Sequence, residues 1–226
     1  MQTLNENTYI RLKRDIMTLR LVPGEAVSAA KVAERYQVSR TPAREAIVKL
    51  AQEGLMEIYP QSRTLVSRID LRRAAQECFV RATLEVGMVP LFTEGCSSAD
   101  IDVMRTLYAR QAEVQEQLRL QPEEEQLLIR NIELDNAFHA VIYTAAGEIL
   151  AKEIIETHTT HYNRLRFLTD MVRGTREQTL TEHRQILAAA ETRDTALLQA
   201  ILKKHIRRID SNQTIVMDRY PEYFQQ

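Results

Sequence analysis

Residues 31–50 of the chain read Lys31-Val-Ala-Glu-Arg-Tyr-Gln-Val-Ser-Arg-Thr-Pro-Ala-Arg-Glu-Ala-Ile-Val-Lys-Leu50 and contain two helical patterns separated by a tight turn. We expect the first helix to end near Tyr36. Ser39 or Thr41 caps the second helix, because a side-chain oxygen there accepts a hydrogen bond from the N–H groups of the first turn. Pro42 fits that turn, where its missing N–H costs little. The segment therefore predicts a helix-turn-helix.

The residues on either side complete a small domain. Apolar residues between Tyr9 and Leu19 recur at helical spacing and predict a helix that ends before Val22-Pro23. Residues 55–59 and 64–67 alternate around a turn, which predicts a two-stranded hairpin. Three helices and a hairpin make a winged helix-turn-helix, which we assign to residues 1–68.

The second helix of this motif carries arginines where major-groove readout needs them. Arg40 and Arg44 lie four residues apart on one face, and an arginine there can bond a guanine through two hydrogen bonds. The alternative is that both are solvated surface charges. Arg63, at the tip of the wing, either enters the minor groove or is an ordinary turn residue. Ser39 and Thr41 would contact phosphate, and Lys49 would strengthen binding to any DNA sequence by a similar amount. The predicted DNA-binding residues are Ser39, Arg40, Thr41, Arg44, Lys49 and Arg63.

Charge is distributed unevenly along the chain of 226 residues. Residues 1–68 hold eleven basic and seven acidic residues, a net charge of +4, whereas residues 69–226 hold 19 basic and 24 acidic residues, a net charge of −5. A small basic domain on a larger acidic one suggests a polyanion-binding head on a body with another task. Because the sequence shows no membrane-spanning stretch, secretory leader or disulfide framework, we expect a cytoplasmic protein without a membrane partner.

The second part of the chain, residues 69–226, shows helical periodicity with few breaks and no strand pattern. The predicted helices cover about 70–93, 99–119, 122–146, 148–169, 177–191 and 194–217. We therefore expect a mainly α protein in which an N-terminal winged helix-turn-helix precedes a C-terminal antiparallel all-helical bundle. The interior of such a bundle is the natural place for a ligand or metal.

Four side chains in this bundle predict a metal site. Asp135 and His139 are four residues apart and project from one helix face. His183 and His205 lie about equally far from the turn between the last two helices, so antiparallel packing places them at the same height. Three imidazoles and a carboxylate suit a divalent transition metal, zinc first and nickel second, with positions left for an acid ligand. The alternative for each histidine is a hydrogen-bonded core or surface side chain.

The first part of the chain resembles a known family. Val38-Ser39-Arg40-Thr41-Pro42, followed by Arg44-Glu45-Ala46, is similar to the recognition-helix signature of the GntR family of bacterial transcription regulators. Segments around Asp135-x-x-Phe138-His139, Glu182-His183 and His205-Ile206 resemble the FCD effector-binding domain of the FadR branch of that family. The resemblance implies that Asp135, His139, His183 and His205 hold metal.

The same resemblance implies two effector-binding residues. Arg81 lies in an Arg81-x-x-x-Glu85 pattern whose arginine often meets the effector's carboxylate in that family, and the alternative is an ion pair with Glu85. Asn163 is a further candidate for the pocket, together with Arg164 and Arg166. We expect an exposed polar face for at least two of these three.

These observations predict a homodimeric transcription regulator, expected to be a repressor, that binds palindromic double-stranded operator DNA. A small organic acid at the metal site would control it. One alternative is a regulator whose metal site is structural, or is itself the sensor, with no organic effector. Another is a metalloenzyme, which the lack of an HExxH-type element, nucleophile motif or phosphate loop in the sequence disfavours. We therefore expect no enzyme activity.

Overall fold

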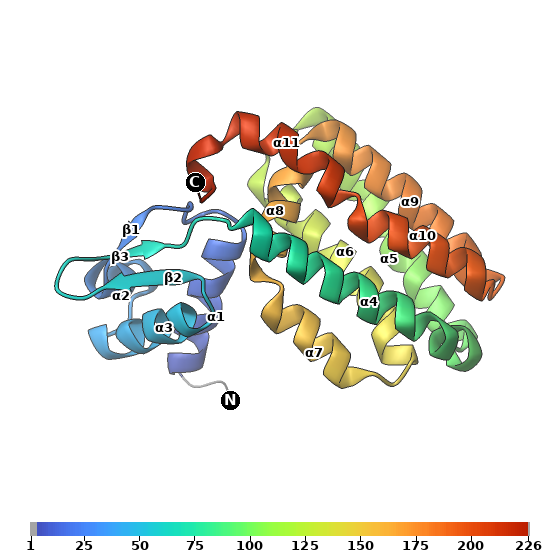
Figure 1. Ribbon diagram of the computed structural model, residues 1–226, viewed down its shortest axis with the longest axis horizontal. Helices are drawn as coiled ribbons and strands as arrows, with labels where there is room; N and C mark the ends of the chain where they lie inside the picture. The colour runs from blue at the N-terminus through green and yellow to red at the C-terminus, as the bar shows by residue number, and fades with distance from the viewer. Residues whose placement is uncertain (1–3, 226) are drawn as a thin grey trace.

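The computed structural model describes residues 4–225, apart from the side chains of Leu4, Asn5, Arg173 and Asp210. Figure 1 shows a small head formed by the N-terminal part of the chain and a larger, all-helical body. The two meet where the chain enters the long helix α4. This division matches the predicted fold class, a winged helix-turn-helix followed by a helical bundle.

The head is built from three helices and three strands. In chain order they are α1 (Leu4–Met17), β1 (Ala26–Val27), α2 (Ala29–Tyr36), α3 (Arg40–Gln52), β2 (Met56–Tyr59) and β3 (Arg63–Val66). The strands form an antiparallel sheet of order β1-β3-β2. The predicted helix-turn-helix and hairpin are confirmed, whereas the sequence pattern does not predict the two-residue strand β1.

Local capping and a buried core place α3 on the head. The hydroxyl of Ser28 accepts a hydrogen bond from the Lys31 N–H at 3.2 Å and starts α2. Gln37 ends that helix in the left-handed region, with φ of 56°, and so makes the tight turn into α3. Leu12 and Ile16 of α1 pack without exposed surface against Leu50 of α3. One face of α3 is therefore fixed to the head and the other is left to solvent.

The body contains α4 (Leu71–Gly95), α5 (Ser98–Leu120), α6 (Glu125–Ala145), α7 (Ile149–His158), α8 (Thr160–Asp170), α9 (Arg173–Glu191), α10 (Thr195–Arg207), α11 (Ile209–Arg219) and a 3-10 turn (Pro221–Tyr223). Helices α4, α6, α9 and α10 share a core that includes Phe92, Phe138, Ile142, Ile186 and Leu202. Within the described part of the chain, no helix combines the length and apolar composition needed to cross a membrane.

Two predicted helices are each divided into two. The helix expected at 148–169 is α7 followed by α8, with a break at Thr159. The hydroxyl of Thr159 donates to the carbonyl of Ile155 at 2.5 Å, and such side-chain bonds compete with the regular helical pattern. The helix expected at 194–217 breaks at Arg208 into α10 and α11. At the second break the backbone of Arg208 stays in the right-handed helical region.

Candidate metal centre and DNA-binding surface

The predicted recognition residues lie at the N-terminal end of α3. Ser39 is the N-cap residue, in extended conformation, and its side chain makes no capping hydrogen bond. Its hydroxyl is therefore available to a phosphate. Arg40, Thr41 and Arg44 follow in the first turns of the helix and are exposed. The structure thus brings these four residues together at one end of α3.

Lys49 and Arg63 lie apart from that group. Lys49 is in the last turn of α3, where its Nζ lies 3.8 Å from the ring centroid of Tyr9 on α1. Arg63 begins β3, and its Cζ lies 5.3 Å from the ring centroid of Tyr59. Both cations are exposed, but each already has an aromatic partner. Their contact with DNA stays a prediction.

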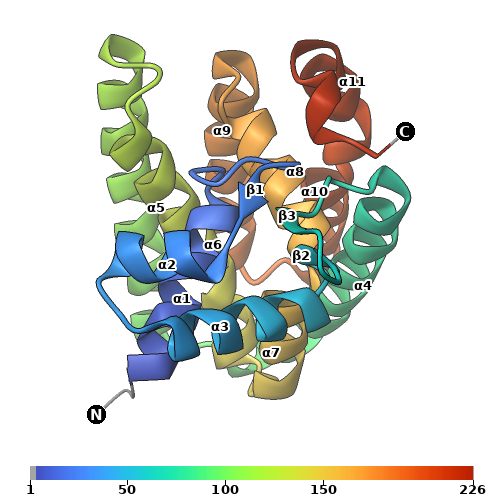
Figure 2. The same ribbon diagram turned by 90° about the vertical axis from the view of Figure 1, so that its left-hand side faces the viewer.

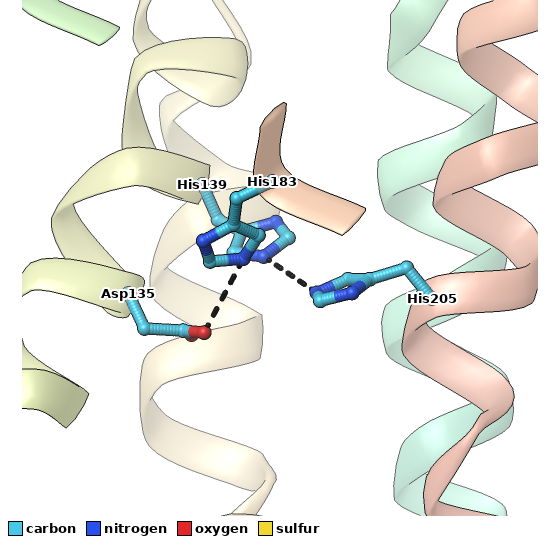
Figure 3. A group of neighbouring side chains, drawn as sticks. All are labelled: Asp135, His139, His183 and His205. Atoms are coloured by element: carbon cyan, nitrogen blue, oxygen red, sulfur yellow. Dashed lines mark hydrogen bonds and ion pairs between the residues drawn. The ribbon is translucent and has the colours of Figure 1, made fainter. Parts of the chain in front are cut away.

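The four predicted metal ligands converge inside the body. Asp135 and His139 come from α6, His183 from α9 and His205 from α10, and all four are buried (Figure 3). Their ligand atoms lie within 4.8 Å of one another. The Nε2 atoms of His139 and His205 are 3.2 Å apart, and Nε2 of His183 is 3.4 Å from Oδ1 of Asp135. Three histidines and a carboxylate from three different helices therefore surround one point.

Each of these histidines is held by a hydrogen bond at its other ring nitrogen, Nδ1. A neutral imidazole that donates from Nδ1 keeps its lone pair on Nε2, where a metal binds it. The three acceptors are not predicted from the sequence as partners of the histidines. They are Oε2 of Glu85 for His139 at 2.8 Å, Oε1 of Gln111 for His183 at 2.7 Å, and Oε2 of Glu182 for His205 at 2.8 Å.

This donor set fits a cation better than it fits hydrogen bonds among its own members. When the Nδ1 atoms carry the protons, three Nε2 lone pairs and the Asp135 carboxylate converge without a proton to share. Nε2 of His183 and Oδ2 of Asp135 are buried without a hydrogen-bond partner among the described residues. A divalent transition metal satisfies such atoms, and imidazole with carboxylate suits zinc or nickel.

Burial and charge keep this centre in the protonation state that a metal requires. Burial lowers the pKa of His183 and of His205 well below the ordinary value, and neighbouring histidines add to the shift. Burial alone would raise the pKa of Asp135. Arg166, 3.3 Å from its Oδ2, acts together with His183, His139 and Arg81 to outweigh that effect, and the pKa of Asp135 is held below its usual range. The carboxyl is therefore ionised and these two imidazoles are neutral at neutral pH.

A pocket of about 450 Å³ adjoins the centre. His139 reaches its wall, and the two predicted effector residues, Arg81 and Asn163, line it as well. Arg166, which pairs with Asp135, supplies a second guanidinium group. A concave site with basic groups beside apolar walls suits a small organic anion.

Arg81 lines the pocket and also pairs with Glu85. Its Nε lies 2.5 Å from Oε1 of Glu85, and both side chains are buried. Glu85 in turn holds His139 and accepts a hydrogen bond from the Tyr143 hydroxyl. Charge of Arg81 holds the pKa of Glu85 below its usual range despite its burial, which alone would raise it. The two interpretations of Arg81 are therefore compatible, because one guanidinium can serve both Glu85 and an anion.

The neighbours of Asn163 on α8 differ from the expectation. Asn163 and Arg166 line the pocket, whereas Arg164 is fully buried and donates to the carbonyl of Ser67 at 2.6 Å. The expectation of an exposed face for at least two of these three residues is wrong. The reason is that α8 is covered on one side by the connection between head and body and borders the pocket on the other.

Comparison with known families accounts for both parts of the chain. Residues 4–66 match the family described as bacterial regulatory proteins, gntR family, and residues 78–208 match the FCD domain. The chain belongs to the GntR family and carries an FCD domain. It is a DNA-binding transcription regulator. The predicted boundary between residues 68 and 69 falls between the two matches and stays a prediction, and its outer ends at 1–3 and 226 lie outside the described residues.

Relatives of similar length support this assignment. The regulator is 28% identical over 223 residues to an uncharacterized HTH-type transcriptional regulator in an unstable DNA locus of Streptomyces ambofaciens, covering 99% of this chain and 90% of that protein. It is 27% identical over 223 residues to the HTH-type transcriptional repressor RspR of Escherichia coli K12, covering 99% and 94%. The solved structure of E. coli McbR/YncC has the same fold, with a TM-score of 0.77, 21% identity and coverage of 97% and 100%.

The families and relatives are transcription regulators and not enzymes. The expectation that this GntR-family protein is not an enzyme is thereby confirmed, and the metalloenzyme alternative is dropped.

Proposed function

We propose that this regulator is a homodimeric repressor whose affinity for a palindromic operator is controlled by a small carboxylate bound at a divalent metal. Asp135, His139, His183 and His205 would hold the metal, and Arg81 and Asn163 would contact the acid. The observation that carries the proposal is the convergence of the four ligand groups beside a basic pocket. A bound metal supplies a Lewis acid to which a carboxylate oxygen coordinates.

The residues around the centre favour an anion over a neutral ligand. Arg81 and Arg166 line the pocket with their guanidinium groups, and both are shielded from water. A guanidinium binds a carboxylate through paired hydrogen bonds, which are stronger in such a site than in solution. Asn163 adds an amide whose Nδ2 is held by the hydroxyl of Thr159 at 2.9 Å, so that the side chain has a fixed position.

The dimer is inferred from the symmetry of the operator, and the sign of regulation from a relative. Two winged heads related by a two-fold axis match a palindromic operator, which favours a homodimer. The E. coli relative RspR is named a repressor, which favours repression here. We propose that residues 1–68 bind DNA, that residues 69–226 bind the effector and form the dimer, and that the protein acts in the cytoplasm, where its operator is found.

The physical switch is a difference in affinity between two head arrangements. An acid changes operator binding only if it binds more tightly to the arrangement that does not fit two half-sites. Since the pocket borders α8, and α8 contacts the connection between head and body through Arg164 and Ser67, bound acid can favour one arrangement. We expect the acid to release DNA.

The test combines elemental analysis, native mass spectrometry and gel-shift titration on untagged protein. We expect about one transition metal per chain, a dimeric mass and release of operator DNA by at least one acid from a panel of hydroxy, di- and aromatic carboxylates. Asn163→Ala, which leaves the Arg81–Glu85 pair intact, should bind metal and DNA but respond less to acid. A metal-free dimer whose DNA affinity no acid changes would contradict the proposal while leaving DNA binding intact.

A second function, without an organic effector, is supported by the close grouping of four ligand side chains at the centre. With three oriented histidines and a carboxylate, the metal can be the signal or a purely structural element. In that case His183→Ala would abolish folding or the response to metal, and no acid would bind wild-type protein. Gel shifts at controlled free zinc, without any acid, separate this function from the first.

A further inference from the structure

The pocket beside the metal centre is bounded by both the head and the body. From the body it is lined by α4, α6, α7 and α8, and from the head it is lined by α1. The α1 residues Ile10, Lys13, Arg14 and Met17 are spaced as on one face of a helix, and Thr18, directly after the helix, lines the pocket as well. Figure 2, with the head towards the viewer, shows α1 behind α2 and α3, on the side of the head that faces the body.

Helix α1 therefore has two different faces. Leu12 and Ile16 are fully buried in the head core, whereas Ile10, on the pocket side, leaves 41% of its surface exposed. Across the pocket lie Ile132, Ile155 and other apolar side chains of the body. Apolar side chains from both domains thus line the pocket, and a ligand with an apolar section would bury surface on both.

Cations line the pocket from both domains, together with the carboxylates of Glu133 and Glu156. Arg81 and Arg166 accompany the metal centre at the inner end, and Lys13 and Arg14 belong to α1. Within the described structure, Lys13 uses two of its three N–H donors, on Glu53 at 2.7 Å and on the Tyr9 hydroxyl at 3.2 Å. Arg14 forms one ion pair, with Glu133 at 3.3 Å. Both cations retain donors for a second anionic group.

Lys13 also connects the pocket to the recognition helix. Glu53, its partner, is the C-cap residue of α3, and its Oε1 accepts a hydrogen bond from the Tyr9 hydroxyl at 2.6 Å. The ring of Tyr9 also contacts Lys49 of α3, whose Nζ lies 3.8 Å from the ring centroid. An anion beside Lys13 would compete with Glu53 for the same ammonium group and weaken this attachment.

We infer that α1 is the outer wall of the effector site and that Lys13 and Arg14 bind a second carboxylate, so that the effector is a diacid with an apolar middle held between head and body. The inference rests on the proposed function, because it takes the inner carboxylate to lie at the metal centre. It adds the class of ligand and a direct contact between the ligand and the DNA-binding head.

Three acids probe the two ends separately in calorimetric titrations of zinc-loaded, full-length protein. Suberate has two carboxylates, octanoate has the same number of carbons and one carboxylate, and acetate reaches only the inner end. We expect suberate to bind about tenfold or more tightly than octanoate, since hydrogen bonds to charged groups contribute about 1.5–3 kcal/mol. Octanoate should bind more tightly than acetate because of the apolar section.

Variants on α1 assign the outer end. Lys13→Gln and Arg14→Gln should each weaken suberate binding about tenfold and leave octanoate binding within about twofold. Arg11→Gln is the matched control, because Arg11 lies on α1 outside the pocket, over the ring of Tyr36. Equal zinc content and unchanged octanoate binding show that a variant is folded. Hydrogen exchange at the end of α3 should rise with suberate and not with octanoate.

The outcomes separate this inference from the proposed function. If octanoate and acetate bind in a manner that His183→Ala abolishes, but suberate binds no more tightly or ignores both α1 variants, the inference is overturned and the proposed function stands. If none of the three acids binds zinc-loaded wild-type protein, both are overturned for these ligands, even though DNA binding persists.

Discussion

Nε2 of His139 and Nε2 of His205 lie 3.2 Å apart, although each ring is already held at Nδ1 by a glutamate carboxylate. A carboxylate accepts and cannot donate, so each Nδ1 carries the proton and each Nε2 presents a lone pair. Two acceptors at this distance repel each other in a buried site unless a proton or a cation lies between them. We therefore expect the stability of the body to depend on whether a proton or a cation lies between these two nitrogens.

Metal removal should lower thermal stability. A metal that binds only the folded state at about 100 times its dissociation constant adds about 2.7 kcal/mol, which for a chain of this size corresponds to about 5–10 °C in Tm. Chelation of zinc-loaded protein, followed by differential scanning calorimetry, measures the shift. His205→Ala should melt at the same temperature with and without zinc. His158→Ala, which changes an exposed histidine of α7, should keep the full response; equal responses of the two variants would contradict the assignment.

The partners of the histidines should matter almost as much as the histidines. Glu182→Ala removes the acceptor of His205 Nδ1 without removing a ligand. Outer partners of this kind contribute about 10–100-fold to metal affinity. Competition with a chromophoric chelator measures the zinc dissociation constant, and Glu182→Gln, which keeps an oxygen acceptor, should lose less. Glu191→Ala, on the same helix but paired with Arg105 at the surface, serves as the control. Unchanged affinity in Glu182→Ala would show that His205 does not need this bond.

The buried pair of Arg81 and Glu85 should show strong coupling. Arg81→Gln leaves Glu85 buried without its cation, which costs about 3–5 kcal/mol, while removing both charges costs less. Urea unfolding of Arg81→Gln, Glu85→Gln and the double variant gives the coupling free energy. The double variant should be more stable than Arg81→Gln and still fail to respond to acids. A double variant whose loss of stability equals the sum of the two single losses would mean that the pair is not coupled.

The head was open to prediction from sequence because its signals are local. The start of α3 at Ser39 and the proline in its first turn each depend on a few neighbouring residues, although the predicted capping hydrogen bond of the Ser39 side chain does not form. Strand β1, which adds to the predicted hairpin, has only two residues and pairs with β3. A segment this short has no recognisable alternation of apolar and polar residues. Its formation depends on the fold of the whole head.

The metal centre was predictable only in part. Asp135 and His139 share a helix face, and the turn before α10 sets the level of His183 and His205. Gln111, by contrast, lies 72 residues from His183, so nothing in its spacing points to that histidine. Glu85 lies four residues after Arg81, and this spacing predicts an ion pair between the two. The spacing gives no sign that Glu85 also bonds His139. That α1 lines the pocket depends on how the head packs against the body, and the spacing of apolar residues along the sequence does not predict this packing.

Arg40 and Lys49 should differ in their effect on DNA binding. Arg40→Ala should cost about 1–3 kcal/mol on an operator selected from random DNA and much less on unrelated DNA, because a base contact is lost. Lys49→Ala should weaken both by similar amounts and reduce the dependence of affinity on salt. Fluorescence anisotropy at several salt concentrations measures both effects, with Arg72→Ala on the exposed side of α4 as the control. An equal loss on both DNAs for Arg40→Ala would exclude a base contact.

His161 should make stability depend on pH at the connection between head and body. Its buried Nδ1 accepts a hydrogen bond from the Asp70 N–H at 3.0 Å. Burial, and then the charge of Arg164, lowers the pKa of His161 to about 4. An unfolded histidine has a pKa near 6.5, so below about pH 6.5 the unfolded chain takes up a proton that the folded chain does not, and stability falls as the pH is lowered towards about 4.

The size of this effect follows from the difference in pKa. Between about pH 7.5 and pH 5, His161 should account for a loss of up to about 2 kcal/mol in the free energy of unfolding. His161→Asn keeps an oxygen acceptor for the Asp70 N–H but does not titrate, so it should lose less stability than wild type over this range. Urea unfolding at both pH values measures the two losses, and the other histidines cancel in the comparison. If wild type and His161→Asn lose the same free energy of unfolding, His161 has a similar pKa in the folded and unfolded chains. Its burial then does not make the protein less stable in acid.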